Sequence, residues 1–338
     1  MRVFYIQTYC LKEILIMRTE HDFLGEMQVS DELYYGVQTL RAMENFHITE
    51  KKIDHDFVVA MAMVKKASAL ANMKTGRLDK TIGEAIVKAA DEVIAGQFAD
   101  QFPVDPIQGG AGTSFNMNMN EVLANRALEI LGHPKGSYDI ISPNNHINMA
   151  QSTNDSFPTA IKVCAILKSK PLIAALEGLV AELEVKADEY KDVLKMGRTH
   201  LQDAVPITLG QEMGAYASGV RRGIRRIKSA VELAHTINMG ATAVGTGLNA
   251  EPSYIEDVAK ELRSVVGVEF HTADNLIDAT NNTDIFADIS SGIKVTCLVL
   301  IKMANDFRLM ASGPRCGIGE LKLPPRQPGS SIMPGKVN

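Results

Sequence analysis

The chain has 338 residues, 46% of them hydrophobic, which is enough to bury a substantial apolar core in one large domain or two ordinary ones. Its formal net charge is −5, and its Lys and Arg residues are scattered apart from two adjacent arginine pairs, so nucleic acid is not an expected partner. The four cysteines form no Cys-x-x-Cys pair, which argues against a disulfide scaffold or a cysteine-based zinc site and favours a reducing, cytoplasmic location.

The first sixteen residues contain apolar stretches, but Lys12 and Glu13 interrupt them and no small-residue cleavage site follows. This segment predicts neither a signal peptide nor a membrane span, and no span is expected elsewhere in the chain. Residues 17–20 begin a stretch that is ordinary for an enzyme. We therefore expect residues 1–16 to be a non-native or disordered leader.

Ala, Met, Leu, Ile and Val recur at helical spacing through most of the chain, which predicts a mainly α protein. Shorter helices are expected at residues 56–73, 80–95 and 120–131. Three windows exceed the length of an ordinary globular helix, at residues 156–192, 209–238 and 284–312. Because these windows are apolar over a wide arc, we expect them to pack in a bundle, partly against other subunits.

Strand signals are sparse, and the best short candidates are residues 34–37 and 265–270. Pro, Asn and His break the helical pattern at residues 142–149, which is the clearest boundary in the chain. We predict an N-terminal helical domain over 17–148 and a central helical-bundle domain over 149–338.

Polar clusters interrupt the apolar windows where helices begin or turns expose backbone amides. The glycine-rich residues 109–114 precede a helix whose N-terminus favours an anion, although a simple turn with an N-cap is the more common origin of such a cluster taken alone. Residues 151–155 also fit a capped helix start with Pro158 in the first turn. Residues 196–203 place a Thr beside His200 in a turn that begins at a Gly, although a lone His is more often structural.

The last cluster, residues 329–338, joins two hydroxyls, a Lys and an Asn in a glycine-flanked loop. It is not a nucleotide-binding loop, because five residues rather than four separate its glycines and Val337 replaces the required Ser or Thr. The chain stops directly after this loop. We therefore expect the C-terminal end of the protein to be missing.

Metal and triad chemistry have no support in the sequence, which contains neither His-x-x-x-His, nor a carboxylate cluster with ligand spacing, nor a Gly-x-Ser-x-Gly elbow. Hydroxyls, amides, one Lys and one His remain at the expected helix ends. A donor-rich site of this kind, without a cofactor, suits a small polyanion such as a dicarboxylate.

Taken together, the four clusters resemble those of the aspartase/fumarase superfamily over nearly the whole chain after the leader. Residues 329–338 match its signature, Gly-Ser-Ser-x-Met-Pro-x-Lys-x-Asn, at every fixed position. Residues 112–114, 142–144 and 238–243 look more like the aspartate ammonia-lyases than the class II fumarases, whereas residues 312–320 look more like fumarase. The resemblance implies an L-aspartase-like fold, here an N-terminal helical domain and a partial central bundle, in a homotetramer whose active sites each draw on three subunits.

The activity implied is the reversible anti elimination of ammonia from L-aspartate, through an enediolate carbanion, to give fumarate. The matching motifs make Ser330 the general base, acting as an alkoxide that loop amides and Lys336 stabilise. The substrate β-carboxylate would be held by Thr113, Ser152, Thr153 and Ser331. The α-carboxylate would be bound by Thr199, Lys336 and Asn338, and the amino group would be contacted by Asn154 and His200.

The resemblance implies no cofactor, and activation by a divalent cation, which some aspartases show, stays open because no ligand cluster explains it. Two alternatives to the ammonia-lyase also remain. One is a class II fumarate hydratase. The other is a catalytically inactive fragment that acts only as an oligomerising subunit.

Overall fold

The computed structural model describes residues 16–110, 112–333 and 335–336, so Asn338 and almost all of the expected leader lie outside the described residues. Two compact units emerge from the contacts within the chain. The first comprises the described residues up to Lys168 together with Ala234–Thr283, and the second comprises Ser169–Leu233 and the described residues from Asp284 onward. The predicted domains, 17–148 and 149–338, stay a prediction.

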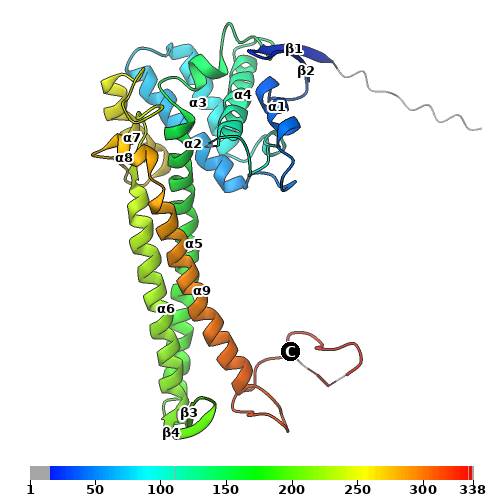
Figure 1. The fold of residues 1–338 in the computed structure, drawn as a ribbon, viewed down its shortest axis with the longest axis vertical. Coiled ribbons are helices and arrows are strands. Elements are labelled where there is room, and N and C mark those ends of the chain that lie inside the picture. The colour runs from blue at the N-terminus through cyan, green and yellow to red at the C-terminus, as the bar shows by residue number, and fades with distance from the viewer. Residues whose placement is uncertain (1–15, 111, 334, 337–338) are drawn as a thin grey trace, which may run out of the picture. The chain divides into compact units, whose positions relative to one another are not determined.

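The first unit is a cluster of helices with one antiparallel hairpin and one short parallel strand pair (Figure 1). The hairpin pairs β1 (Met17–Asp22) with β2 (Gly25–Ser30), and β5 (Thr236–Ile237) pairs with β6 (His271–Thr272). The helices are α1 (Val37–Asn45), α2 (His55–Lys74), α3 (Lys80–Ile94), α4 (Thr113–Ile130), α7 (Pro252–Val266) and α8 (Leu276–Asn281). Single turns occur at Ala99–Gln101 and Pro143–Ile147, the latter a π-helical turn.

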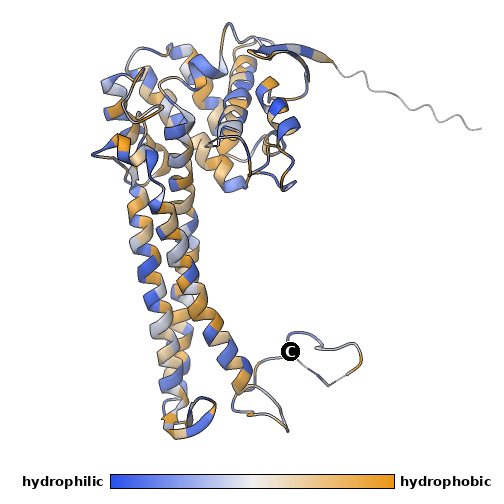
Figure 2. Cartoon of the chain, in the orientation of Figure 1, coloured by the Kyte–Doolittle hydropathy of each residue, from blue (hydrophilic) through white to orange (hydrophobic). Residues whose placement is uncertain are grey.

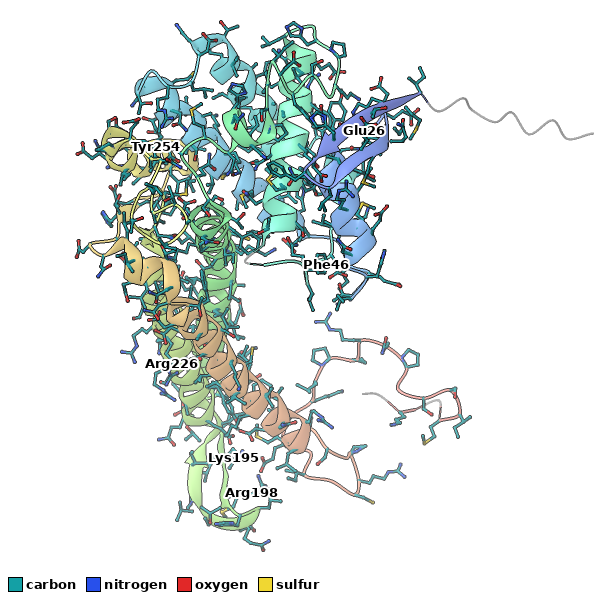
Figure 3. All side chains as sticks on the ribbon, turned by 45° about the horizontal axis from the view of Figure 1, so that its top comes forward. Glu26, Phe46, Lys195, Arg198, Arg226 and Tyr254 are labelled. Atoms are coloured by element: carbon teal, nitrogen blue, oxygen red, sulfur yellow. The ribbon has the colours of Figure 1, made fainter. Side chains whose placement is uncertain are left out.

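Helix α2 forms the centre of the first unit and packs against α3, α4 and α7. It begins where the Asp54 carboxylate accepts a hydrogen bond from the Asp56 N–H. Its alanines are mostly buried and let the neighbouring helices approach closely, while Met61 is fully buried and contributes about 2 kcal/mol of hydrophobic free energy. Tyr254 of α7 (Figure 3) is buried as well, and its hydroxyl donates to Ser68 Oγ of α2 over 3.2 Å.

The second unit consists of long helices and a hairpin. The second part of α5 (Thr153–Glu189), α6 (Leu209–Glu232) and α9 (Asp284–Met310) run side by side, and a short turn at Leu233–His235 follows α6 (Figure 1). Helices α6 and α9 approach closely because glycines lie at their contact. A Cβ atom on Gly223 would lie 2.7 Å from Thr296 Cγ2. The three long windows of the sequence are therefore confirmed as helices.

Helix α9 carries exposed apolar residues along its length, and Figure 2 shows hydrophobic positions alternating with polar ones on it. Leu298 is 57% exposed and Ile301 is 56% exposed. Such a surface fits a helix that buries a second face against another subunit. The homotetramer implied by the sequence stays a prediction.

Both predicted strands are wrong. Residues 34–36 have no regular structure and Val37 begins α1, because two buried carboxylates take the backbone N–H groups that a strand would pair. Glu121 accepts from the N–H groups of Gly36, Gln38 and Thr39, and Glu20 accepts from that of Val37. Residues 265–266 end α7, and Gly267 then takes a left-handed conformation with φ of 72°.

The turn predicted to begin at a Gly is instead a β-hairpin, formed by β3 (Leu194–Thr199) and β4 (Gln202–Thr208). Its connection is the dipeptide His200-Leu201, with φ angles of 50° and 64°. Such a turn matches the right-handed twist of the two strands. Gly197 lies within β3, where a Cβ atom would be 2.8 Å from the Val205 carbonyl oxygen.

Two glycines of the second unit make a matched test of helix packing. At Gly210, in the first turn of α6, a Cβ atom would lie 2.3 Å from the Ala187 carbonyl oxygen, whereas at Gly178 of α5 it would meet nothing within 4 Å. We predict that Gly210→Ala lowers the free energy of unfolding by about 1–3 kcal/mol. Gly178→Ala should leave it unchanged or raise it by up to about 1 kcal/mol. Thermal unfolding of both variants measures the difference, and equal effects would contradict the packing described here.

Candidate functional site

The predicted site residues are distributed over both units. The first unit carries Thr113, Ser152, Thr153 and Asn154. The second unit carries Thr199, His200, Ser330, Ser331 and Lys336. Asn338 lies outside the described residues.

Helix α5 begins at a reciprocal cap in the first unit. Ser152 Oγ accepts the Asn154 N–H over 3.1 Å, and the Ser152 N–H donates to Asp155 Oδ1 over 2.9 Å. The interpretation of residues 151–155 as a capped helix start is therefore confirmed, except that Pro158 lies in the second turn. The cap holds Thr153 and Asn154 in the first helical turn, where both are only partly exposed.

Asp155 is fully buried and connects the start of α5 to a second loop. Its other carboxylate oxygen accepts the N–H groups of Gly240 and Thr242 over 3.2 and 3.0 Å. Burial raises the pKa of Asp155 to about 7, although these backbone hydrogen bonds oppose the rise. The same loop accepts a hydrogen bond from Asn154, whose Nδ2 lies 2.7 Å from the Ala243 carbonyl oxygen.

A buried network of amide side chains lies behind this cap. Asn116 of α4 donates to Thr153 Oγ1 over 3.1 Å and to Asn148 Oδ1 over 3.2 Å. Asn120 donates to the same Asn148 oxygen over 3.1 Å. Asn116 in turn accepts a hydrogen bond from Ser156 Oγ. Asn116 thus holds the Thr153 hydroxyl, and Asn148 and Ser156 hold Asn116 in turn. The sequence signal for this network is the three Asn residues at alternate positions 116, 118 and 120.

The glycine-rich residues 109–114 end at the start of α4. Gly112 has φ of 92°, and a Cβ atom there would lie 2.2 Å from the Phe157 ring, so this position admits only glycine. The Thr113 N–H donates to the Gly109 carbonyl oxygen over 3.2 Å, as in the turn that the sequence suggests. Gly112 has no side chain to cap this helix start, and Gln108 Oε1 accepts the Phe115 N–H in its first turn over 2.6 Å. Thr113 itself is exposed.

In the second unit, Thr199 and His200 lie at the tip of the β3–β4 hairpin, and both are exposed. Lys195 and Arg198 project from the same hairpin (Figure 3). Arg198 binds Glu320 through two hydrogen bonds of 2.6 and 3.1 Å, and Lys195 lies 3.0 Å from the same carboxylate. The hydrogen bonds from Arg198 lower the pKa of Glu320. This ion cluster attaches the hairpin to the segment that follows α9.

The terminal loop folds on itself. The Gly329 N–H donates to the Lys336 carbonyl oxygen over 2.9 Å, and the Lys336 N–H donates to that of Met333 over 3.0 Å. Ser330 is partly exposed, and its Oγ accepts the Ile332 N–H over 3.3 Å. Ser331 and Lys336 are exposed.

Within the described part of the chain, no group of three or more His, Cys, Asp or Glu side chains is placed to hold a metal ion. The helices of that same part include none long and apolar enough to cross a membrane.

A family model described as a lyase matches residues 25–338. The aspartate ammonia-lyase of Bacillus subtilis (strain 168) is 57% identical over 321 residues, which cover 95% of this chain and 68% of that protein. The chain belongs to this lyase family. The aspartate ammonia-lyase of Escherichia coli (strain K12) is 47% identical over 325 residues, with coverage of 95% and 68%.

Solved structures agree with the family. A fumarate lyase:delta crystallin from Brucella melitensis, bound to cobalt, superposes with a TM-score of 0.93 at 48% identity, covering 96% of this chain and 71% of that one. A class II fumarase from Schistosoma mansoni gives a TM-score of 0.92 at 38% identity, with the same coverage. The predicted mainly α aspartase/fumarase fold and the predicted carbon-nitrogen lyase class are confirmed.

The buried carboxyl of Asp155 makes stability depend on pH. Because its folded pKa of about 7 exceeds the ordinary 3.8, the folded state binds this proton more tightly, and the stability contributed is lost as pH rises from about 4 to 7. Asp155→Asn cannot titrate. We predict that the free energy of unfolding of wild type, measured relative to this variant by urea denaturation, falls by roughly 4 kcal/mol at most over that range. A difference that stays constant with pH would show that Asp155 is not protonated on burial.

Proposed function

We propose that this chain is an aspartate ammonia-lyase that removes ammonia from L-aspartate to give fumarate, reversibly. The observation that carries the proposal is the set of aspartate ammonia-lyases that are 47–57% identical over 95% of the chain. The family match runs from residue 25 to residue 338 and so spans the sequence clusters from which the site residues come. It favours the ammonia-lyase over other members of the same fold.

The chemical difficulty is the weak acidity of the proton on C3 of aspartate. Its removal leaves an electron pair that delocalises into the neighbouring carboxylate, which then carries a second negative charge as an enediolate. That pair next forms the C2–C3 double bond and ammonia leaves. Donors directed at this carboxylate therefore lower the barrier more than they strengthen ground-state binding. We assign this role to Thr113, Ser152, Thr153 and Ser331.

The cap at the start of α5 suits this role because its groups are held before substrate arrives. Ser152 is fixed by its hydrogen bonds with Asn154 and Asp155, and Thr153 by Asn116. Preorganised donors need little rearrangement when charge develops in the transition state. The site residues on the exposed hairpin and loop have fewer such supports.

We assign the general base to Ser330. A serine must act as an alkoxide to take the C3 proton, so it needs nearby donors and positive charge. The short closed loop places the backbone N–H of Ile332 against Ser330 Oγ and carries Lys336 on the same segment. Glycines at 329 and 335 allow the loop to move onto bound substrate and exclude water.

The remaining contacts complete recognition of aspartate. Asn154 Nδ2 donates to the Ala243 carbonyl oxygen, and this hydrogen bond fixes the orientation of the amide. We propose that Asn154 Oδ1 then accepts a hydrogen bond from the substrate ammonium group, which His200 also contacts. Thr199, Lys336 and Asn338 would bind the α-carboxylate, Asn338 from outside the described residues.

We also propose a cytoplasmic homotetramer. The exposed apolar residues of α9, such as Leu298 and Ile301, favour burial against further helices of other copies. The resemblance implies that each active site of such a tetramer draws on three subunits.

Fumarate hydratase is the second candidate, favoured by the resemblance to the class II fumarase of known structure. The two activities separate in one assay that follows the ultraviolet absorbance of fumarate with L-aspartate or L-malate as substrate. A rise with aspartate alone supports the ammonia-lyase, and a rise with malate alone supports the hydratase. A silent protein would favour the inactive, oligomerising fragment.

Replacing the proposed base gives a direct test of the mechanism. We predict that Ser330→Ala lowers kcat for aspartate by at least about a thousandfold, because it removes the oxygen to which we assign abstraction of the C3 proton, while substrate binding stays measurable. Steady-state kinetics and calorimetric binding of succinate provide the two readouts. Ser264→Ala, which removes an exposed helical hydroxyl bonded to the Lys260 carbonyl, serves as the control. Near-normal turnover by Ser330→Ala would assign the base elsewhere.

A further inference from the structure

Lys65 of α2 is a buried cation that the proposed mechanism does not use. Its side chain is among the largest fully buried ones, with a relative exposure of 1%. Its ammonium donates to Asn148 Oδ1 over 3.0 Å and to Gln151 Oε1 over 2.9 Å, both neutral amide oxygens. Burying an ammonium with neutral partners costs several kcal/mol, so stability does not account for a lysine at this position.

Both hydrogen bonds of Lys65 reach the cap at the start of α5. Gln151 directly precedes Ser152 in the chain. Asn148 accepts from Lys65 and from Asn116, and Asn116 also donates to Thr153. The ammonium therefore holds both sides of the segment that presents the two proposed carboxylate-binding hydroxyls.

The hydrogen bonds among these partners close the network. Asn148 Nδ2 donates to the Gln151 carbonyl oxygen over 3.1 Å, so the acceptors of Lys65 also bind each other. Asp155 interacts with Lys65 electrostatically. Its carboxylate oxygens accept hydrogen bonds from the N–H groups of Ser152, Gly240 and Thr242. Burial lowers the pKa of Lys65 to about 7, and the Asp155 carboxylate opposes that fall.

We propose that Lys65 is a positioning residue of the lyase site, which orients the segment from Asn148 to Thr153 and contributes positive potential where a substrate carboxylate binds. The inference rests on the proposed function, because it takes the carboxylate to be held by Ser152 and Thr153. Positive charge in a dry interior acts over a longer distance than in water. Its effect should be greatest when the carboxylate gains its second negative charge, so kcat should fall more than KM rises when it is removed.

Lys162 of α5 provides a matched control in the same unit. Its side chain is also buried, with 3% relative exposure, and its ammonium donates to the Thr236 carbonyl oxygen over 2.7 Å. This contact joins α5 to β5, nine residues along the helix from Thr153. Substitution of either lysine by Met removes one buried ammonium. The hydrogen bonds of Lys65 lead to the site segment, whereas the hydrogen bond from Lys162 to Thr236 leads to β5.

The test compares wild type, Lys65→Met and Lys162→Met. Succinate serves as a dicarboxylate probe in calorimetry, aspartate turnover gives kcat and KM, and thermal unfolding reports the fold. We expect Lys65→Met to weaken succinate binding and to lower kcat/KM for aspartate by roughly 10- to 100-fold, mainly through kcat. Lys162→Met should stay within about threefold of wild type on both measures. If Lys65→Met fails to fold, Lys65→Gln keeps a neutral donor and should show the same losses.

Distinct outcomes separate this inference from the function on which it rests. Undiminished succinate binding and turnover in a folded Lys65 variant would overturn the role of Lys65 alone, as would equal losses in the Lys65 and Lys162 variants. Wild type that binds succinate but releases no fumarate from aspartate would overturn the ammonia-lyase, while the succinate comparison would still decide the role of Lys65. Wild type that binds no succinate would overturn both.

Discussion

The conformation at the start of α5 depends on one constraint. Polar atoms that are buried away from water cost free energy unless they form hydrogen bonds within the protein. Asp155 meets it with three backbone N–H groups drawn from two segments, and Asn148 meets it with donors from α2 and α4. Because leaving a buried polar group unpaired costs more free energy than one hydrogen bond contributes, such a network has few alternative arrangements. Rigidity at Ser152 and Thr153, two of the proposed carboxylate-binding residues, therefore follows from the burial of their neighbours. The hydroxyls themselves need only partial exposure to reach a ligand.

The same constraint acts at the start of α1, where the Glu121 carboxylate accepts backbone N–H groups that would pair with a neighbouring strand in a sheet. Its buried carboxylate accepts from the backbone N–H groups of Gly36, Gln38 and Thr39 and from the Thr39 hydroxyl, and burial raises its pKa to about 7. The aromatic residues 34–35 favour a strand by local propensity, but a carboxylate from another helix overrides it. Local sequence could not reveal this, because Glu121 lies 85 residues away from Gly36.

The sequence predicted the long helices but not the hairpins, and α9 and β4 show why. The long windows succeed because apolar residues recur at 3.6-residue spacing over many turns, as in α9. Strand β4 is largely exposed, so it lacks the alternation of buried and exposed residues by which a strand is recognised. The site shows the same division. Ser330 and His200 belong to polar clusters that the sequence shows directly. Lys65 and Asn116 instead lie inside helical windows, where a polar residue is expected on the solvent-exposed face. Only the packing of the helices shows that both are buried.

The hydrogen bonds around the proposed site residues also suit the catalytic role assigned to each residue. A group that stabilises developing charge performs best when it is already in place, and Ser152 and Thr153, two of the residues assigned to that role, lie at a helix start with buried partners. A base that must close over the substrate and then release the product needs a segment that can move, and Ser330 lies on a loop held by a few backbone hydrogen bonds of its own. If the carboxylate donors lay on the loop and the base on the helix start, the donors would be mobile and the base could not move onto the substrate. Rigid donors and a mobile base are thus two requirements of one elimination, and the chain meets them with different kinds of structure.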